Sequence, residues 1–218
     1  MIIKSAYRIC PADGHEPDYR ELIPDAGLRR RMSRIVRMGV ASALECLRSF
    51  PGLVPDAVIT ATALGPLADT EKFLGEMTAR EESLLNPAPF IYSTFNTVAG
   101  QIALIKGIKS YNITYVNGGE SFRDAMLDAA LCISEGRKDI LVVYYDEVTP
   151  FAGTVMDMMG CRHIDDAVAV SFLLSGDTES AESGISGYRL DIQADSRDIR
   201  TNAVSADSLY MEYLRTRI

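Results

Sequence analysis

The sequence has 218 residues, 47% of them hydrophobic and 24% charged, and a formal net charge of −8. This length and composition exclude a largely disordered chain and are typical of one globular domain with a sizeable core. The acidic balance argues against nucleic-acid binding, which needs clustered lysine and arginine side chains.

Hydrophobic periodicity predicts alternating strands and helices in the first half of the chain. In chain order these are a strand at residues 2–10, a long amphipathic helix at 27–49, a strand at 56–63 and a helix at 69–82. Asp25 stands close to the start of the long helix, whose arginines we interpret as a solvated face, with a contact patch for an acidic partner as the alternative. Two prolines at 86–90 indicate an irregular connection before a helix at 96–107.

The second half predicts a β-α-β unit, made of a strand at 112–116, a helix at 121–135 and a strand at 139–145. Continuous apolar strands separated by helices indicate a parallel sheet that helices cover on both faces. Strands at 167–174 and 185–194 are then expected to pair antiparallel at the edge of the sheet.

These elements predict an α/β fold with a mixed sheet of about five strands and an antiparallel edge pair near the C-terminus. We expect a domain at 1–194 and a polar C-terminal tail at 195–218 that ends in a short docking helix.

No apolar run of about 18 residues occurs, and the N-terminus is too polar for a signal peptide, so we expect a cytoplasmic protein without membrane contact. The cysteines, Cys10, Cys46, Cys132 and Cys161, match no C-x-x-C or zinc pattern. We expect the four thiols to be free, and we expect no bound metal and no cofactor.

The stretch 111–126 combines a strand that we expect to be buried, a tight glycine turn and an amphipathic helix. A turn of this kind often holds a nucleophile, because the N-terminus of the helix lowers the pKa of a thiol placed there. The tip carries Gly118, Gly119 and Glu120 instead, so it supplies no thiol or hydroxyl.

Ser121 follows the tip and is the best substitute nucleophile, near the positive end of the helix dipole. The pattern S-F-R-D favours a capping box, in which Ser121 accepts from the Asp124 amide and Asp124 reaches back. We therefore interpret Ser121 as a helix cap. Glu120 is interpreted as a carboxylate stabilised by the dipole, with an acid or base as the alternative.

Two further groups offer reactive side chains. Cys161 and His163 bring a thiol and an imidazole close in sequence, but no third group is evident. Asp146 and Glu147 stand side by side at a strand end. We do not favour a catalytic Cys-His pair for the first group. We likewise do not favour a metal site or an acid pair for the second.

Four segments in the same order resemble the N-terminal half of a β-ketoacyl synthase, which has the thiolase fold. They are T-A-T-A-L-G-P-L-A-D-T-E-K-F-L at 60–74, F-N-T-V-A-G-Q-I-A-L-I-K-G-I-K at 95–109, I-S-E-G-R-K-D-I-L-V-V-Y-Y-D-E at 133–147 and the segment that begins at Cys161. The resemblance covers about residues 1–194 and implies a thiolase-like half-fold. D-E-V-T-P at 146–150 is similar to a divergent branch associated with aryl polyene or flexirubin-type pigment pathways.

The resemblance also implies where an active ketosynthase would carry its chemistry. The acyl-accepting cysteine of the family falls on Gly119, and the two family histidines belong to a C-terminal half for which we find no counterpart. His15 and His163 lie in no matching motif. The resemblance further implies a structural role for Glu147 and substrate contacts at Asn117, Gly119, Phe122 and Cys161.

Two functional hypotheses follow. The first is a noncatalytic subunit that forms a homodimer, or a heterodimer with a full-length ketosynthase, through the strand at 112–117, with acyl carrier protein as a further partner. A half-fold would leave one layer uncovered, and the partner would cover it. The alternative is an acyl-binding or acyl-transferring enzyme that uses the turn at 117–121 as an oxyanion hole. The sequence favours the noncatalytic subunit.

Overall fold

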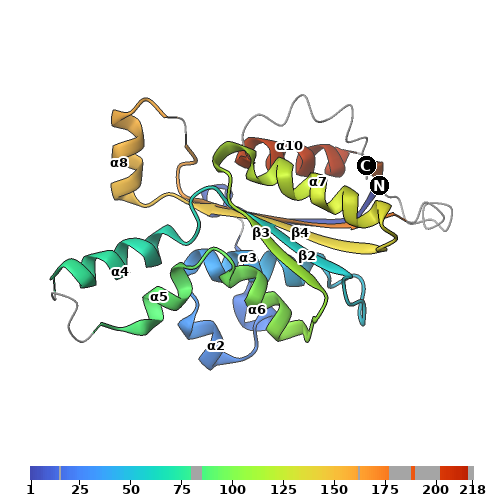
Figure 1. The fold of residues 1–218 in the computed structure, drawn as a ribbon, viewed down its shortest axis with the longest axis horizontal. Helices are drawn as coiled ribbons and strands as arrows, with labels where there is room; N and C mark the ends of the chain where they lie inside the picture. The colour runs from blue at the N-terminus through green and yellow to red at the C-terminus, as the bar shows by residue number, and fades with distance from the viewer. Residues whose placement is uncertain (15, 80–84, 162, 177–187, 190–201, 216–218) are drawn as a thin grey trace.

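The computed structural model describes residues 1–14, 16–79, 85–161, 163–176, 188–189 and 202–215. Their centre is a six-stranded sheet with the strand order β3-β2-β4-β5-β1-β6. The strands are β1 (Ile2–Ile9), β2 (Ala57–Ala61), β3 (Tyr111–Tyr115), β4 (Asp139–Glu147), β5 (Ala167–Ser175) and the short β6 (Tyr188–Arg189). Helices cover both faces of the sheet (Figure 1), which confirms the predicted mixed, helix-covered α/β architecture.

The sheet has a parallel half and an antiparallel half. β2 pairs parallel with both β3 and β4, whereas β5 pairs antiparallel with both β4 and β1. The predicted direct pairing of 167–174 with 185–194 is wrong, because β1 lies between β5 and β6. Apart from the two residues of β6, the predicted strand at 185–194 lies outside the described residues.

The apolar strand residues alternate between two cores, because successive side chains point to opposite faces of the sheet. Val143 and Tyr145 belong to the core under α3 (Arg34–Cys46) and α6 (Thr97–Lys106). Val142 and Tyr144 belong to the other core, which α7 (Ser121–Ser134) and α10 (Asn202–Arg215) cover. Figure 1 shows α7 and α10 side by side on one face and α3 with α6 on the other.

Helix α10 covers the part of the sheet that we expected to need a partner. Ala206 and Tyr213 are buried in the α7-side core, and α10 contacts β1, β4 and β5. The guanidinium of Arg8 also donates to both carboxylate oxygens of Asp207, at 2.7 and 3.0 Å. The predicted docking helix is therefore present and covers the sheet over β1, β4 and β5, while Leu131 on α7 and Met211 on α10 stay exposed. The predicted domain boundary between residues 194 and 195 lies outside the described residues.

The predicted long helix at 27–49 is two helices, α2 (Ala26–Arg31) and α3. Met32 and Ser33 are extended between them, with ψ angles of 132° and 172°. The break buries the Met32 side chain in the core. Ser33 is a residue type that favours helix starts, so the sequence carried a signal for the break. A short helix α1 (Tyr19–Leu22), without a predicted counterpart, precedes the pair.

Three helices extend beyond the carboxyl ends of the strands: α4 (Leu67–Ala79), α5 (Pro87–Ser93) and α8 (Pro150–Met158). α5 replaces the predicted irregular connection, because Asn86 accepts from the Ala88 amide as a cap and Pro87 occupies the first helical position, where proline is tolerated. α8 was not predicted at all. Within the described residues no helix is long and apolar enough to cross a bilayer. The cytoplasmic location stays a prediction.

Candidate functional site

The glycine turn lies between β3 and α7, as the sequence predicts. It consists of Asn117 and a single 3-10 turn over Gly118–Glu120, with Gly118 at a φ of 51°. Gly118 and Gly119 are exposed at the surface of the chain. Because Gly119 has no side chain, the position onto which the sequence resemblance places the ketosynthase cysteine offers only backbone groups.

Ser121 lies on the inner side of this turn, and its hydroxyl bonds to the turn on two sides. Its Oγ accepts from the Asn117 amide at 2.7 Å and donates to the Gly118 carbonyl at 2.9 Å. The side chain is fully buried. The predicted capping box is wrong, because Ser121 already has helical angles and the Asp124 carboxylate accepts instead from the side-chain amide of Asn117. The hydroxyl thus holds the shape of the turn.

The other backbone groups of the turn are also largely engaged. The Glu120 amide donates to the Asn117 carbonyl at 3.0 Å, and the Ser121 amide donates to the Gly118 carbonyl. The Glu120 carboxylate forms an exposed ion pair with Arg123 at 3.1 Å. An oxyanion hole needs free amides that converge on one point, and the amides of Glu120 and Ser121 are not free for one.

A serine substitution tests the structural interpretation of Ser121. Ser121→Ala should lower the free energy of unfolding by about 1–2 kcal/mol, because the Asn117 amide and the Gly118 carbonyl lose their hydrogen bonds to the buried hydroxyl. Urea denaturation measures the change, with the exposed Ser134→Ala as the control. Labelling of Ser121 in the folded protein by a serine-reactive fluorophosphonate would contradict this interpretation and support a nucleophile.

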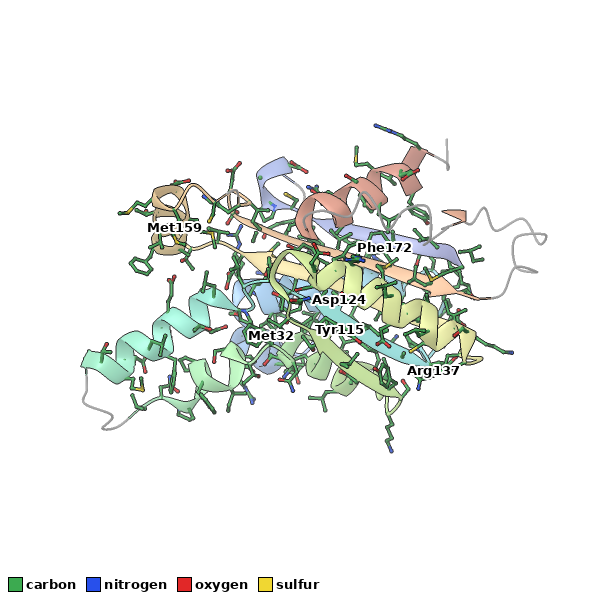
Figure 2. The ribbon with its side chains drawn as sticks, turned by 45° about the horizontal axis from the view of Figure 1, so that its top comes forward. Met32, Tyr115, Asp124, Arg137, Met159 and Phe172 are labelled. Atoms are coloured by element: carbon green, nitrogen blue, oxygen red, sulfur yellow. The ribbon has the colours of Figure 1, made fainter. Side chains whose placement is uncertain are left out.

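The structure separates the residues expected to contact substrate. Phe122 is fully buried and packs against Tyr144 and Phe172, with ring centroids 6.0 and 5.8 Å away. Cys161 is exposed and follows α8, a helix that projects from the sheet at a distance from α7 (Figure 1). Figure 2 likewise shows Met159, near Cys161, far from Asp124 on α7. Of the expected set, only Asn117 and Gly119 lie together at the turn.

His163 does not form a catalytic pair with Cys161. Its Nδ1 lies 2.8 Å from the Ile164 carbonyl and its Nε2 lies 3.0 Å from the Asp157 carboxylate. These bonds raise the pKa of His163, first through the Ile164 carbonyl and then through Asp157. Both ring nitrogens are therefore engaged in holding the end of α8. His15 lies outside the described residues.

Asp146 and Glu147 hold the loop between β2 and α4 in place. Asp146 accepts from the hydroxyls of Thr62 and Tyr144, at 2.6 and 2.7 Å, and from the amides of Ala63 and Leu64. Glu147 accepts from the Ala68 amide at 2.9 Å. Burial raises the pKa of both carboxyl groups, and their hydrogen bonds act in the opposite direction. Within the described residues no group of acidic, histidine or cysteine side chains is arranged to hold a metal ion.

The loop between β2 and α4 contacts Phe95, which lies beside β3. Gly65, at a φ of 70°, lies against the ring of Phe95, so a Cβ at this position would stand 2.5 Å from the ring. The Tyr145 hydroxyl donates to the Phe95 carbonyl. Phe95 in turn borders an open groove of about 660 Å³ beside β3, whose lining is Ser93, Thr94, Phe95, Asn96, Asn112, Ile113, Thr114 and Val116. No pattern in the sequence indicated this groove directly.

β3 is an edge strand, and the expectation that it is buried is wrong. Its residues are half-buried or exposed, and among the strands that the structure describes its one partner is β2. The Tyr115 carbonyl accepts from the Thr62 amide of the segment after β2, at 3.1 Å. Because backbone groups alternate along a strand, those of Asn112, Thr114 and Val116 point to the open edge. Phe95, Val116 and Leu131, 44%, 42% and 61% exposed, flank it.

The comparisons with known proteins agree with this architecture. The family described as β-ketoacyl synthase, N-terminal domain, matches residues 4–214. The chain belongs to this family. The match includes both halves of the sheet, the glycine turn and α10. A search among curated protein sequences finds no significant match.

Solved structures share the β-ketoacyl synthase fold with this chain. The ketosynthase (ApeO) in complex with its chain length factor (ApeC) from Xenorhabdus doucetiae matches with a TM-score of 0.65 and 22% identity, over 79% of this chain and 77% of that chain. The ishigamide ketosynthase/chain length factor matches with a TM-score of 0.62 and 19% identity, over 76% of this chain and 49% of that one.

A type II PKS acyl-carrier protein in complex with its ketosynthase bound to the hexaketide (AntDE:AntF) matches with a TM-score of 0.71 and 15% identity. Here the match covers 85% of this chain and 65% of that chain. The chain thus spans between half and about three quarters of the solved β-ketoacyl synthase relatives that it resembles.

Proposed function

We propose that this chain is a noncatalytic β-ketoacyl-synthase-like subunit that pairs through β3 with an active, full-length ketosynthase in fatty-acid or polyketide-type biosynthesis. The observation that carries the proposal is the open edge of β3, whose outward backbone groups can continue the sheet into another chain. Two of the similar structures are named as a ketosynthase with its chain length factor, which supports the same kind of partnership here.

The groove beside β3 suits a role in shaping the acyl tunnel of the partner. Phe95 and Val116 supply exposed apolar surface, and hydroxyl and amide groups of Thr94, Asn96 and Asn112 line the rest. A ketosynthase paired along β3 would enclose this groove. The D-E-V-T-P segment at 146–150 supports an aryl polyene or flexirubin-type pathway as the setting.

Acyl carrier protein is the further partner that we propose. Arg30 and Arg31 are exposed on α2 and stand in a cluster with Arg29, although the chain as a whole has a net charge of −8. Opposite charges attract across an interface, so this local cluster is the part of the chain best suited to contact a carrier protein through an acidic surface. One similar structure contains an acyl-carrier protein in complex with its ketosynthase.

The alternative function, an acyl-binding or acyl-transferring enzyme centred on the turn, has less support. The Ser121 hydroxyl is buried and makes two hydrogen bonds, and the amides of Glu120 and Ser121 donate hydrogen bonds within the turn. Glu120 is exposed and paired with Arg123, an arrangement typical of a surface ion pair.

Placing a cysteine at the tip tests whether the turn lacks only a nucleophile. Gly119→Cys should give no detectable condensing activity in the chain alone, because no described histidine contacts the turn to promote decarboxylation. A malonyl-dependent condensation assay measures this, with an active ketosynthase as the positive control. Condensation by Gly119→Cys without a partner would contradict the noncatalytic proposal.

Co-expression tests the proposed partnership. The tagged chain and an untagged full-length ketosynthase from the same source should copurify as a complex with one copy of each, identified by native mass spectrometry. Separate elution of the two proteins would contradict the proposal and direct attention back to the turn.

A further inference from the structure

Helix α8 has little apolar anchorage of its own. None of its residues is buried, and Phe151, Val155, Met158 and the following Met159 are among the large apolar side chains that stay exposed. Figure 1 shows the helix projecting away from the sheet, and Figure 2 shows Met159 on this projection. Because no apolar core holds α8, its position depends mainly on the polar contacts at its two ends.

Different groups hold the two ends of α8. At the start, the Thr149 hydroxyl donates to the carboxylate of Glu71 on α4. At the end, Nε2 of His163 lies 3.0 Å from the Asp157 carboxylate, and a Cβ at Gly153 would stand 3.7 Å from Cε1 of the ring. Gly153 and Asp157 have the i, i+4 spacing and so share one face of the helix. The imidazole of His163 therefore lies against that face.

His163 belongs to a segment that is fixed to the body of the chain. The guanidinium of Arg34 on α3 donates to both carboxylate oxygens of Asp166, at 2.6 and 2.8 Å. The Asp166 carbonyl accepts from the Val148 amide at 2.7 Å, and β5 begins at the next residue. His163 thus joins a projecting helix to an anchored segment.

Both ring nitrogens of His163 face atoms that can only accept a hydrogen bond. Nδ1 lies 2.8 Å from the Ile164 carbonyl oxygen, and Nε2 faces the ionised carboxylate of Asp157. A neutral imidazole has one N–H group, so it satisfies one of these contacts and turns a lone pair toward the other oxygen. An imidazolium has two N–H groups and satisfies both. The geometry therefore requires the protonated ring.

We propose that His163 is a proton-operated latch for α8, which holds the end of the helix while the ring carries its second proton and releases it when that proton is lost. The charges that act on the ring favour the proton. Asp157 is the only ionisable side chain of α8, and Asp165 contributes a second negative charge from the anchored segment. The other nearby charged groups are engaged elsewhere, because Asp166 is paired with Arg34.

The direction of the pH dependence follows from these contacts. The pKa of His163 is raised from its ordinary value of about 6.5, first by the Ile164 carbonyl and then by Asp157 and Asp165, while desolvation acts in the opposite direction. The latch is therefore fully closed below about pH 6.5 and opens as the pH rises through the raised pKa. The proton thus controls the placement of an apolar surface. This latch does not involve β3 and is independent of the proposed function.

A histidine titration by NMR tests the protonation state. Long-range proton–nitrogen spectra of the two imidazoles distinguish His163 from His15, and His15→Gln assigns the signals. The His163 ring should still be mostly protonated at about pH 6.5. Asp157→Asn should lower the pKa of His163 more than Asp165→Asn does, because Asp157 acts through both a hydrogen bond and its charge. A His163 ring that is mostly neutral at this pH overturns the proposal.

Hydrogen exchange of the α8 amides tests the release. Each rate is divided by the intrinsic rate at the same pH, and about pH 5.5 is compared with about pH 9. Protection of α8 should fall about threefold at the higher pH, the size expected for a partly exposed ion pair, while α7 stays unchanged. His163→Gln cannot titrate, so its α8 protection should be equal at both pH values and match the wild type at high pH. Unchanged protection in the wild type, or the same loss in His163→Gln, overturns the proposal.

Discussion

Replacing Asp146 with alanine should lower the free energy of unfolding by about 3–5 kcal/mol, which makes it one of the most damaging single substitutions in the chain. The carboxylate is buried and accepts hydrogen bonds from the hydroxyls of Thr62 and Tyr144 and from the amides of Ala63 and Leu64. Alanine leaves these donors without an acceptor inside the protein. Urea denaturation measures the loss.

Asp146→Ala should also affect the Phe95 segment beside the open edge of β3, because the loop between β2 and α4 contacts it. Thr62–Gly65 packs against Phe95, so loosening the loop should expose the Phe95 segment to faster hydrogen exchange. The exposed Asp165→Ala is the matched control and should change stability by less than about 0.5 kcal/mol. If Asp146→Ala lowers the free energy of unfolding no more than the control does, the hydrogen bonds of Asp146 do not hold the loop.

Thr114→Pro should weaken the complex with a ketosynthase about 100-fold and leave the chain folded. Proline removes the outward amide of Thr114 and places its ring at the open edge, which costs about 3 kcal/mol where another strand must pair. The ladder between β3 and β2 uses the backbone groups of the alternate residues and is spared. Surface-immobilised ketosynthase and a titration of the chain measure the affinity.

Thr114→Val separates the backbone effect from the side chain. Thr114 and Thr60 share a hydrogen bond at 2.7 Å between their hydroxyls, and both variants lose it. Only proline also loses the outward amide, so valine should bind within about threefold of wild type. Equal binding by Thr114→Pro and Thr114→Val would mean that the ketosynthase does not pair along this edge.

The sequence was most informative where local periodicity and burial agree. The strands β2, β4 and β5 are predominantly apolar, and the structure buries them on both faces. The order of helices and strands, together with four short segments, was sufficient for the family. The position of β1 between β5 and β6 could not be predicted, because nothing in a strand pattern specifies its neighbour.

The site was less predictable because its decisive contacts are long-range. S-F-R-D favours a capping box locally, but the turn lets Ser121 reach back to Asn117 and Gly118 instead. Asp146 was a less favoured acid-pair candidate, and only the fold brings it under a loop more than 80 residues earlier in the chain. β3 looks apolar enough to be buried, yet its place at the end of the strand order leaves it open.

Hydrogen exchange at β3 tests the central claim most directly. The chain is labelled at a dilution where it is monomeric, with and without saturating full-length ketosynthase, and the outward amides of Asn112, Thr114 and Val116 are followed. We predict that all three become strongly protected in the complex, while the α8 amides exchange as before. A ketosynthase that binds without slowing exchange at these three residues would contradict pairing along β3.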